Sequence, residues 1–248
     1  MASQSPAKSP DALRPVTIQP GFMPYAAGSA LVTCGNTKVV CTASLENAVP
    51  PFLVGKAQGW LTAEYSMLPC STLSRKRRDR DKLDGRTVEI QRLIGRCLRP
   101  TVDLKKIGER TLMVDCDVLQ ADGGTRTAAV TGAMVAVAQA LAKFRAEGKL
   151  AESPLGLFVA AVSAGIVNGV PTLDLCYAED VAAEVDINVA MTEEGRFVEV
   201  QGTAEHGPFA REQLDQLLEL AARGIRELIA KQKAALGAET LALLKSGG

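Results

Sequence analysis

The segment from Asp115 to Thr127, DCDVLQADGGTRT, joins a glycine turn to the start of a helix, an arrangement suited to binding an anion. Alternating apolar residues before the turn predict a half-buried strand, and small residues after it predict a helix that runs to about Phe144. Gly123 and Gly124 permit backbone conformations that are closed to other residues. A helix beginning there offers free N–H groups and the positive end of its dipole, and Arg126 adds a planar donor fork that suits phosphate oxygens.

The glycine turn alone does not establish phosphate binding, because tight turns also precede helices for purely structural reasons. The turn lacks the Gly-Lys-Ser/Thr ending of a Walker A loop and the spaced glycines of a dinucleotide-binding turn. Other features of the chain must therefore decide between an anion site and an ordinary turn.

Charge is strongly polarised along this chain, which is neutral overall. Residues 75–110 contain 13 Lys or Arg against 6 Asp or Glu, whereas residues 179–219 contain 11 acidic residues against two arginines. A neutral protein with such polarised segments can present a basic surface to a polyanion and remain soluble. The alternative is a charge run that is simply solvated.

A predicted helix within the basic segment separates apolar from basic side chains. Its apolar positions follow the spacing of one buried helix face: Ile90, Leu93, Ile94, Cys97 and Leu98. Asp84 or Thr87 is expected to cap its start, and Pro100 to end it. The arginines off this stripe, together with the basic run that precedes the helix, favour contact with a nucleic-acid backbone; they are Arg92, Arg96 and Arg99, with Arg77, Arg78 and Arg80.

Five blocks of the sequence resemble the ribonuclease PH family, whose members remove nucleotides from RNA 3′ ends by phosphorolysis, notably during tRNA maturation. The blocks follow the family's order, without large gaps, within about residues 13–236: GWLTAEYSMLP (59–69), GRTVEIQRLIGRCLR (85–99), DCDVLQADGGTRTAAVTGA (115–133), AAVSAGIVNG (160–169) and EVQGTAE (199–205). Five long blocks in register are highly specific to this family.

The resemblance implies a phosphate site built from residues already singled out. Arg86 matches the family's phosphate-binding arginine, and Gly124, Thr125 and Arg126 match its phosphate-binding loop. Inorganic phosphate is then expected to replace water as the nucleophile, which shortens the RNA by one residue and releases a nucleoside diphosphate. Reverse addition of nucleotides from diphosphates is expected from the same chemistry.

Two aspartates complete the site that the resemblance implies. The stretch EDVAAEVD places Asp180 and Asp186 on the family's two active-site aspartates. From the residues alone, we expect Asp180 in a loop or bulge and Asp186 at the start of a strand, and their spacing favours surface salt bridges. The resemblance implies instead a catalytic pair that holds Mg²⁺, an ion that takes oxygen ligands and keeps several waters. The single histidine, His206, receives no role.

Two functions from different classes remain. One is an active phosphorolytic exoribonuclease that trims tRNA precursors and, by extension, rRNA. The other is a non-catalytic RNA-binding subunit of a ring, as some exosome-type relatives of the family are. Degenerate subunits typically lose the aspartates or the phosphate-binding arginine, so the presence of Arg86, Arg126, Asp180 and Asp186 favours the enzyme.

The remaining residue types exclude several other classes of protein. The six cysteines lack metal-ligand spacing, four of them are expected in the core, and reduced thiols suit a cytoplasmic enzyme. The polar N-terminus has no apolar signal core, and no apolar run approaches the length of a membrane span. One Trp and three Tyr are too few for a base-stacking platform, so Trp60 and Tyr65 are expected in the core or an interface.

The order of predicted elements favours an α+β fold made of two βα halves. The elements are a hairpin at 31–34 and 38–43, strands near 111–119, 157–165, 172–177, 186–192 and 196–201, the two helices above, and a last helix from about Glu212. The resemblance specifies the ribosomal protein S5 domain 2-like fold of the ribonuclease PH family. We expect a flexible tail over residues 1–12, a single domain over 13–238 and a C-terminal tail over 239–248.

The resemblance also implies assembly into a homo-oligomer, a hexamer built as a trimer of dimers. Three departures bear on that assembly. Cys70 stands where the family usually has Arg, Ser66 stands where Gly is common, and SPDA precedes LRPVT where a Gly-Arg element is usual. These regions serve subunit contacts and the approach of RNA in the family, so the departures affect the expected hexamer more than the chemistry.

Overall fold

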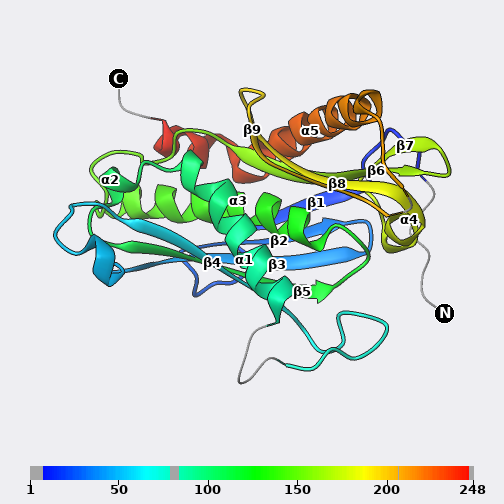
Figure 1. The fold of residues 1–248 in the computed structure, drawn as a ribbon. Helices are drawn as coiled ribbons and strands as arrows, with labels where there is room; N and C mark the ends of the chain where they lie inside the picture. Colours follow the sequence, from blue (N-terminus) through cyan, green and yellow to red (C-terminus); the bar gives the residue numbers. More distant parts are fainter. Residues whose placement is uncertain (1–7, 79–83, 206, 246–248) are drawn as a thin grey trace.

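Two β-sheets enclose a central helix in the computed structural model, which describes residues 8–78, 84–205 and 207–245 (Figure 1). The first sheet has the strand order β1-β2-β3-β5-β4, in which only β4 and β5 run parallel. Its strands are β1 (Val16–Pro20), β2 (Gly28–Cys34), β3 (Thr37–Glu46), β4 (Trp60–Met67) and β5 (Thr111–Gln120). The second sheet is antiparallel with the order β7-β6-β8-β9; its strands are β6 (Val159–Val167), β7 (Val170–Leu173), β8 (Ala183–Thr192) and β9 (Phe197–Ala204).

The central helix, α3 (Thr125–Ala146), packs against both sheets and is buried almost all round. Small residues let the strands approach its backbone closely. A Cβ at Gly132 would lie 2.7 Å from the sulfur of Cys41, and one at Gly28 would lie 2.0 Å from the carbonyl oxygen of Ala136. This explains why the helix is rich in alanine and lacks a polar face.

By length and composition, α3 is apolar enough to cross a membrane, which differs from the expectation that no run approaches this length. However, 89% of its most apolar window is buried inside the protein. Core helices of soluble proteins pass the same test, so the helix is weak evidence for a membrane span.

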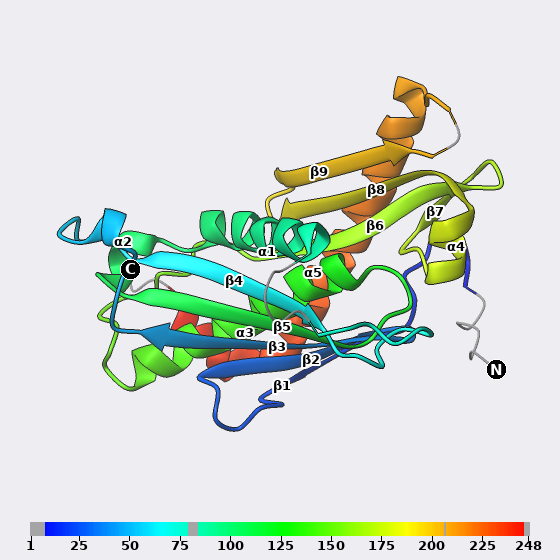
Figure 2. The same cartoon turned by 60° about the horizontal axis from the view of Figure 1, so that its bottom comes forward.

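Helix α1 (Gly85–Leu98) lies between β4 and β9, which are edge strands of the two sheets (Figure 2). Asp84 caps it as expected, because its side chain accepts a 2.6 Å hydrogen bond from the N–H of Thr87. Helix α5 (Arg211–Leu244) packs against α3 and β6 and is kinked at Gly237, whose φ is 75°. The short elements are α2 (Leu104–Ile107), α4 (Tyr177–Ala182) and two 3₁₀ turns at Pro51–Leu53 and Arg99–Thr101.

One hydrophobic core joins the two sheets and the helices between them. Four cysteines lie in it as expected (Cys34, Cys41, Cys97 and Cys116), whereas Cys70 is exposed and Cys176 is half-buried. Tyr65 is buried and Trp60 is partly buried, in agreement with their predicted positions. The predicted α+β class is confirmed.

Both predicted tails are too long within the described residues. At the N-terminal end, the Lys8 ammonium donates to the carbonyl of Leu173 at 2.6 Å, and the N–H of Leu173 donates to the carbonyl of Pro10 at 2.7 Å. At the other end, α5 continues past the kink to Leu244, whose side chain is buried. Apolar side chains beyond Gly237 pack against the hydrophobic core, so the helix continues there instead of fraying.

Candidate active site

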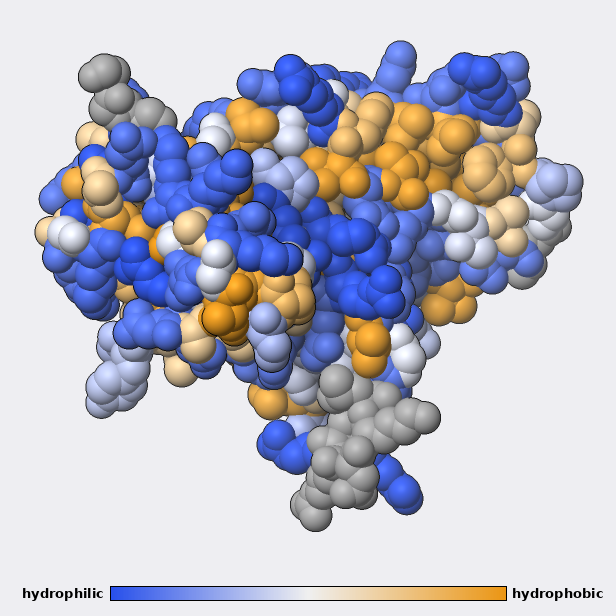
Figure 3. Space-filling model, turned by 60° about the vertical axis from the view of Figure 1, so that its left-hand side comes forward, coloured by the Kyte–Doolittle hydropathy of each residue, from blue (hydrophilic) through white to orange (hydrophobic). Residues whose placement is uncertain are grey.

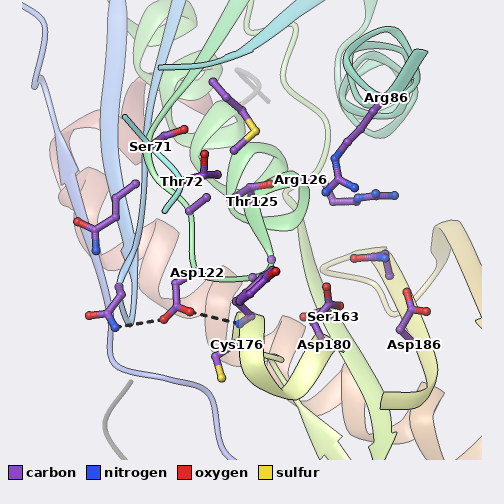
Figure 4. Close-up of a pocket in the computed structure, with 18 of the residues that line it drawn as sticks. Ser71, Thr72, Arg86, Asp122, Thr125, Arg126, Ser163, Cys176, Asp180 and Asp186 are labelled. Atoms are coloured by element: carbon purple, nitrogen blue, oxygen red, sulfur yellow. Dashed lines mark hydrogen bonds between the residues drawn. The ribbon is translucent and has the colours of Figure 1, made fainter. Parts of the chain in front are cut away.

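An open cleft of about 1770 Å³ lies where the two halves of the fold meet, and the predicted phosphate-binding and catalytic residues line it (Figure 4). It is lined by the segment after β4, the start of α1, the glycine turn with the start of α3, the helix α4, and parts of β8 and β9. Arg86, Arg126, Asp180 and Asp186 all belong to its lining. Residues that are distant in the sequence therefore meet in one cavity, as the resemblance implied.

The glycine turn presents an uncapped helix N-terminus to this cleft. Gly123 and Gly124 adopt φ values of 77° and 65°, in the left-handed region that favours glycine. Helix α3 begins directly afterwards at Thr125, and no side chain caps its first N–H groups. Those N–H groups have no partner within the helix. The turn therefore has the donors and the dipole orientation of an anion site.

Two arginines approach the same place from different helices. Arg86 reaches from the start of α1 toward the start of α3 (Figure 4). The guanidinium of Arg126 is 3.5 Å from the carboxylate of Glu89 and 3.3 Å from the side-chain oxygen of Gln201. Glu89 and Gln201 thus hold Arg126 at the cleft wall, whereas Arg86 is exposed.

Asp180 and Asp186 come from adjacent elements on the opposite side of the cleft. Asp180 lies on α4, so the predicted loop or bulge was wrong; Asp186 lies near the start of β8, as expected. Asp180 is exposed at the rim of the cleft, but partial desolvation there still raises the pKa of its carboxyl, and the positive charges of Arg86 and Arg126 oppose that rise. Burial also raises the pKa of Asp186, and the negative charge of Asp180 adds to the rise. The two carboxylates therefore repel each other, and a bound cation would relieve that repulsion.

A magnesium ion fits this pair of carboxylates. Across the described ranges, no group of three or more His, Cys, Asp or Glu could enclose a metal ion. Mg²⁺ does not need such a cage, because it is commonly held by one or two carboxylates and keeps several waters. The donor set is thus suited to a weakly bound, hydrated Mg²⁺.

The predicted RNA-binding arginines divide into exposed and engaged side chains. Arg77, Arg78 and Arg92 are exposed, and Arg80 lies outside the described residues. Arg96 makes two hydrogen bonds to the carboxylate of Glu199, at 2.8 and 3.0 Å.

Arg99 is not the exposed cation that the helical pattern predicted. It donates to the carbonyl of Leu61 at 2.9 Å, and its guanidinium lies 4.3 Å from the centre of the Trp60 ring. Arg99 still has helical backbone geometry, and its N–H donates to the carbonyl of Gly95. The prediction of an exposed side chain was wrong because β4 lies beside this end of α1 and engages the guanidinium.

Several residues of the site were not found from the sequence. Tyr65 donates to the hydroxyl of Thr125 at 2.9 Å, and Ser163 lines the cleft. Glu89 and Gln201 bind Arg126, as described above. Only Glu89 carried a usable signal, since it lies three residues after Arg86 on the polar side of the predicted helix. His206 lies outside the described residues.

Comparison with known proteins identifies the family of this chain. The model of the 3′ exoribonuclease family, domain 1, matches residues 12–142, and that of domain 2 matches residues 158–224. The chain is 58% identical to a ribonuclease PH of Syntrophomonas wolfei over 229 residues, covering 92% of this chain and 96% of that protein. It is 55% identical to a ribonuclease PH of Neisseria meningitidis over 233 residues, covering 93% and 96%.

Solved structures show the same fold at low sequence identity. An Archaeoglobus fulgidus exosome with RNA bound to the active site gives a TM-score of 0.76 at 22% identity, covering 91% of each chain. Rice (Oryza sativa) Rrp46 gives a TM-score of 0.74 at 16% identity, covering 93% of this chain and 99% of that one.

The chain belongs to the 3′ exoribonuclease family, and within it to ribonuclease PH. It is a phosphorolytic 3′-to-5′ exoribonuclease, an enzyme of the nucleotidyltransferase type, and it acts in tRNA processing.

Proposed function

We propose that the cleft binds inorganic phosphate at the N-terminus of α3 and directs it at the terminal phosphodiester of RNA. One observation carries this proposal: the uncapped helix start, Arg86 and Arg126 face the same cavity as Asp180 and Asp186. An anion site and a carboxylate pair in one cleft match the two substrates of phosphorolysis. The anion site would bind inorganic phosphate directly, and the carboxylates would bind the RNA phosphodiester through a cation.

The reaction must bring two anions together. An oxygen of inorganic phosphate forms a bond to the phosphorus of the terminal phosphodiester, and the bond to the 3′ oxygen of the preceding nucleotide breaks. The proton of monohydrogen phosphate balances the one gained by the leaving oxygen, so no strong base is required. Arg86, Arg126 and the turn N–H groups would offset the repulsion and orient the attacking oxygen. The products are a nucleoside diphosphate and RNA shortened by one residue.

Asp180 and Asp186 would hold Mg²⁺ on the side of the scissile phosphodiester. When bound, the ion supplies positive charge that stabilises the phosphoryl oxygens and the leaving 3′ oxygen. The carboxylates themselves fix where that charge lies, and their mutual repulsion favours binding of a cation. Loss of activity in EDTA, with recovery on adding Mg²⁺, would support this assignment, and full activity in EDTA would contradict it.

The basic segment before α1 would guide RNA to the cleft. Arg77 and Arg78 are exposed, and the segment from Cys70 to Lys76 lines one side of the cavity. Several arginines acting on one RNA backbone give binding that depends steeply on salt. The segment is thus suited to grip the body of a tRNA precursor while its 3′ end reaches the phosphate site.

We also propose assembly into a ring, with the hexamer as its expected form. Solved structures of similar fold include an exosome and an archaeal exosome core, and the surface of this chain supports contact between copies. Figure 3 shows an area of hydrophobic side chains on the surface beside a strongly hydrophilic one. Exposed apolar side chains include Phe197 and Val200 on the edge strand β9 and Val88 on α1. Light scattering at several protein concentrations tests this: a monomer that trims tRNA precursors at full rate would contradict the ring and leave the chemistry intact.

The direction of the reaction, the substrates and the location of the enzyme in the cell are further parts of the proposal. Phosphate-driven trimming is nearly balanced in free energy, so excess nucleoside diphosphate would drive addition to the same 3′ end. We propose tRNA precursors as the main substrates, rRNA as a further one, and a cytoplasmic location. The location rests on the free cysteines, which suit a reducing compartment.

A single incubation series tests the proposed function. A tRNA precursor with Mg²⁺ should be shortened only when phosphate is added, and the released product should be nucleoside diphosphate. Nucleoside monophosphate as the main product would mean hydrolysis and would overturn the proposal. RNA binding without any shortening would favour the alternative, a non-catalytic RNA-binding subunit.

A further inference from the structure

A fully buried arginine lies directly beneath the glycine turn. Arg14 precedes β1 and is only 2% exposed, and its partner Asp174 lies between β7 and α4 and is 4% exposed. The guanidinium makes two bonds to that carboxylate, 2.6 Å from Nη2 to Oδ1 and 3.0 Å from Nε to Oδ2. The backbone N–H of Arg14 donates to the same carboxylate at 2.9 Å.

The same guanidinium also holds the glycine turn. Its Nη1 donates to the carbonyl of Asp122 at 2.6 Å, and its Nη2 lies 3.5 Å from the carbonyl of Gly123. The hydroxyl of Thr37 donates to the carbonyl of Gly123 at 2.7 Å and accepts from the N–H of Asp122 at 2.9 Å. Two consecutive carbonyls of the turn are thereby bound on its buried side.

Fixing these carbonyls also fixes the direction of the next two N–H groups. In a planar trans peptide, the C=O and the following N–H point in opposite directions. With the carbonyls of Asp122 and Gly123 held toward Arg14, the N–H groups of Gly123 and Gly124 point the other way. Both glycines line the cleft.

Arg14 also fixes the turn relative to the helix that carries Asp180. A Cβ at Gly123 would lie 2.5 Å from the carbonyl oxygen of Leu175 and 2.8 Å from the nitrogen of Tyr177, so the two backbones are in direct contact. Asp174 immediately precedes this contact and is bound to Arg14. One side chain therefore joins the anion site to the segment that leads into α4.

Stability alone does not explain this arrangement. Burying two charges carries a desolvation penalty, and replacing a buried ion pair by apolar residues is often neutral or stabilising. A bidentate arginine provides something that an apolar pair cannot, because its planar fork fixes the relative position of every group that it binds.

We propose that Arg14 is a positioning residue of the phosphate site: through Asp174 and the turn carbonyls, it aims the turn N–H groups at the attacking phosphate. This inference rests on the proposed function, since it assumes that phosphate binds at the turn. Arg14 is buried and does not line the cleft. Its loss should therefore weaken the use of phosphate more than the binding of RNA.

The test uses the full-length enzyme with the double substitution Arg14→Met and Asp174→Asn. Removing both charges avoids a buried unpaired carboxylate, and Asn tolerates the positive φ of 53° at position 174. We expect KM for phosphate to rise by about tenfold or more, since misplacing a positioned group by about 1 Å can cost about 10²-fold in rate. The dissociation constant for tRNA precursor should change by less than about threefold, and the thermal shift produced by inorganic phosphate alone should shrink.

Arg14→Lys provides a second variant in case the double variant does not fold. It keeps the charge next to Asp174, but one ammonium group cannot bind both carboxylate oxygens and the turn carbonyls. The matched control is Gln232→Met. Gln232 is also fully buried, and it bonds the carbonyls of Thr131 and Val159 at 2.9 Å each. The control should melt at a lower temperature and keep its KM for phosphate.

The possible outcomes separate the two ideas. If wild-type enzyme depends on phosphate and folded Arg14 variants keep its KM, the positioning role is overturned and the proposed function stands. A control that raises KM for phosphate as much as the Arg14 variants would reduce their effect to general destabilisation. Phosphate-independent hydrolysis by the wild-type enzyme would overturn the proposed function, and this inference with it.

Discussion

Tyr65 donates a 2.9 Å hydrogen bond to the hydroxyl of Thr125, which ties β4 to the first residue of α3. Burial raises the pKa of Tyr65, so its hydroxyl stays protonated and remains a donor at neutral pH. A hydroxyl that accepts one hydrogen bond keeps its own hydrogen available. Tyr65 thus orients Thr125 so that Thr125 can donate to an anion in the cleft.

Tyr65→Phe tests this relationship. We expect KM for phosphate to rise about fivefold and the free energy of unfolding to fall by about 1 kcal/mol, the usual net value of one such bond. Steady-state kinetics and denaturant unfolding measure the two effects. Tyr25→Phe is the control, because Tyr25 is fully exposed. Unchanged phosphate kinetics in Tyr65→Phe would show that Thr125 needs no orientation.

Removing either arginine of the anion site should raise the phosphate requirement. Arg86→Ala and Arg126→Ala each lose a charge-assisted bond worth about 1.5–3 kcal/mol, or roughly one to two decades in rate at limiting phosphate. RNA affinity should fall less. Arg226→Ala, an exposed position on α5, is the charge-matched control. Normal rates at low phosphate in either variant would contradict the assignment of the phosphate site.

Neutralising either aspartate should remove most of the turnover and stabilise the fold. Asp180→Asn and Asp186→Asn should each reduce turnover by about 10²-fold or more, the scale seen when one charge-stabilising group is removed. Both carboxyls have pKa values raised above 3.8 in the folded state. A raised pKa means that the folded state binds protons more tightly, so stability falls as the pH rises from 3.8 through the folded-state pKa.

The amide variants lack this loss of stability. Their melting temperatures should therefore exceed that of the wild type at neutral pH, and the difference should vanish below pH 3.8, where the wild-type carboxyls are protonated. Scanning calorimetry across this range provides the measurement. A neutral-pH melting temperature below that of the wild type would show that the carboxylates stabilise the fold.

Substitutions of Arg92 and Arg99, both near the C-terminal half of α1, should affect different properties of the protein. Arg99 bonds the carbonyl of Leu61 and stacks on Trp60, so Arg99→Ala should lower the unfolding free energy by about 1–3 kcal/mol. Arg92 is exposed, so Arg92→Ala should leave stability unchanged and weaken RNA binding. Chemical denaturation and RNA titration of both variants measure the two effects. A stability loss in Arg92→Ala, or unchanged stability in Arg99→Ala, would contradict the assignment.

The basic segment should set the salt dependence of RNA binding. Replacing Arg77, Arg78 and Arg80 together by Ala should flatten the slope of log affinity against log salt by about 2, since each phosphate contact contributes about 0.7–0.9. Cleavage of a very short oligonucleotide should be spared, because it reaches only Arg86 and the aspartates. An unchanged slope with structured RNA would place the RNA path elsewhere.

The sequence determined the local features of this protein. The glycine turn, the start of α3 and the cap at Asp84 follow from residue type and short spacing, which fix backbone conformation within a few residues. The apolar stripe of α1 placed five core residues correctly. The five long blocks identified the family, because so many matching residues in the same order do not arise by chance.

Only the tertiary structure determined which side chains meet. Arg14 and Asp174 are 160 residues apart, and Tyr65 and Thr125 are 60 apart, so no local pattern links either pair. The edge strand β1 was missed because it is short and half-covered, and tertiary pairing decides whether such a strand forms. Strand β4 was also missed, although apolar and polar residues alternate along it. Arg99 was misassigned because its side chain is engaged by Leu61 and Trp60 of β4, which are distant from it in the sequence. Contacts between distant segments depend on how the two sheets pack around α3, and that packing is a property of the whole chain.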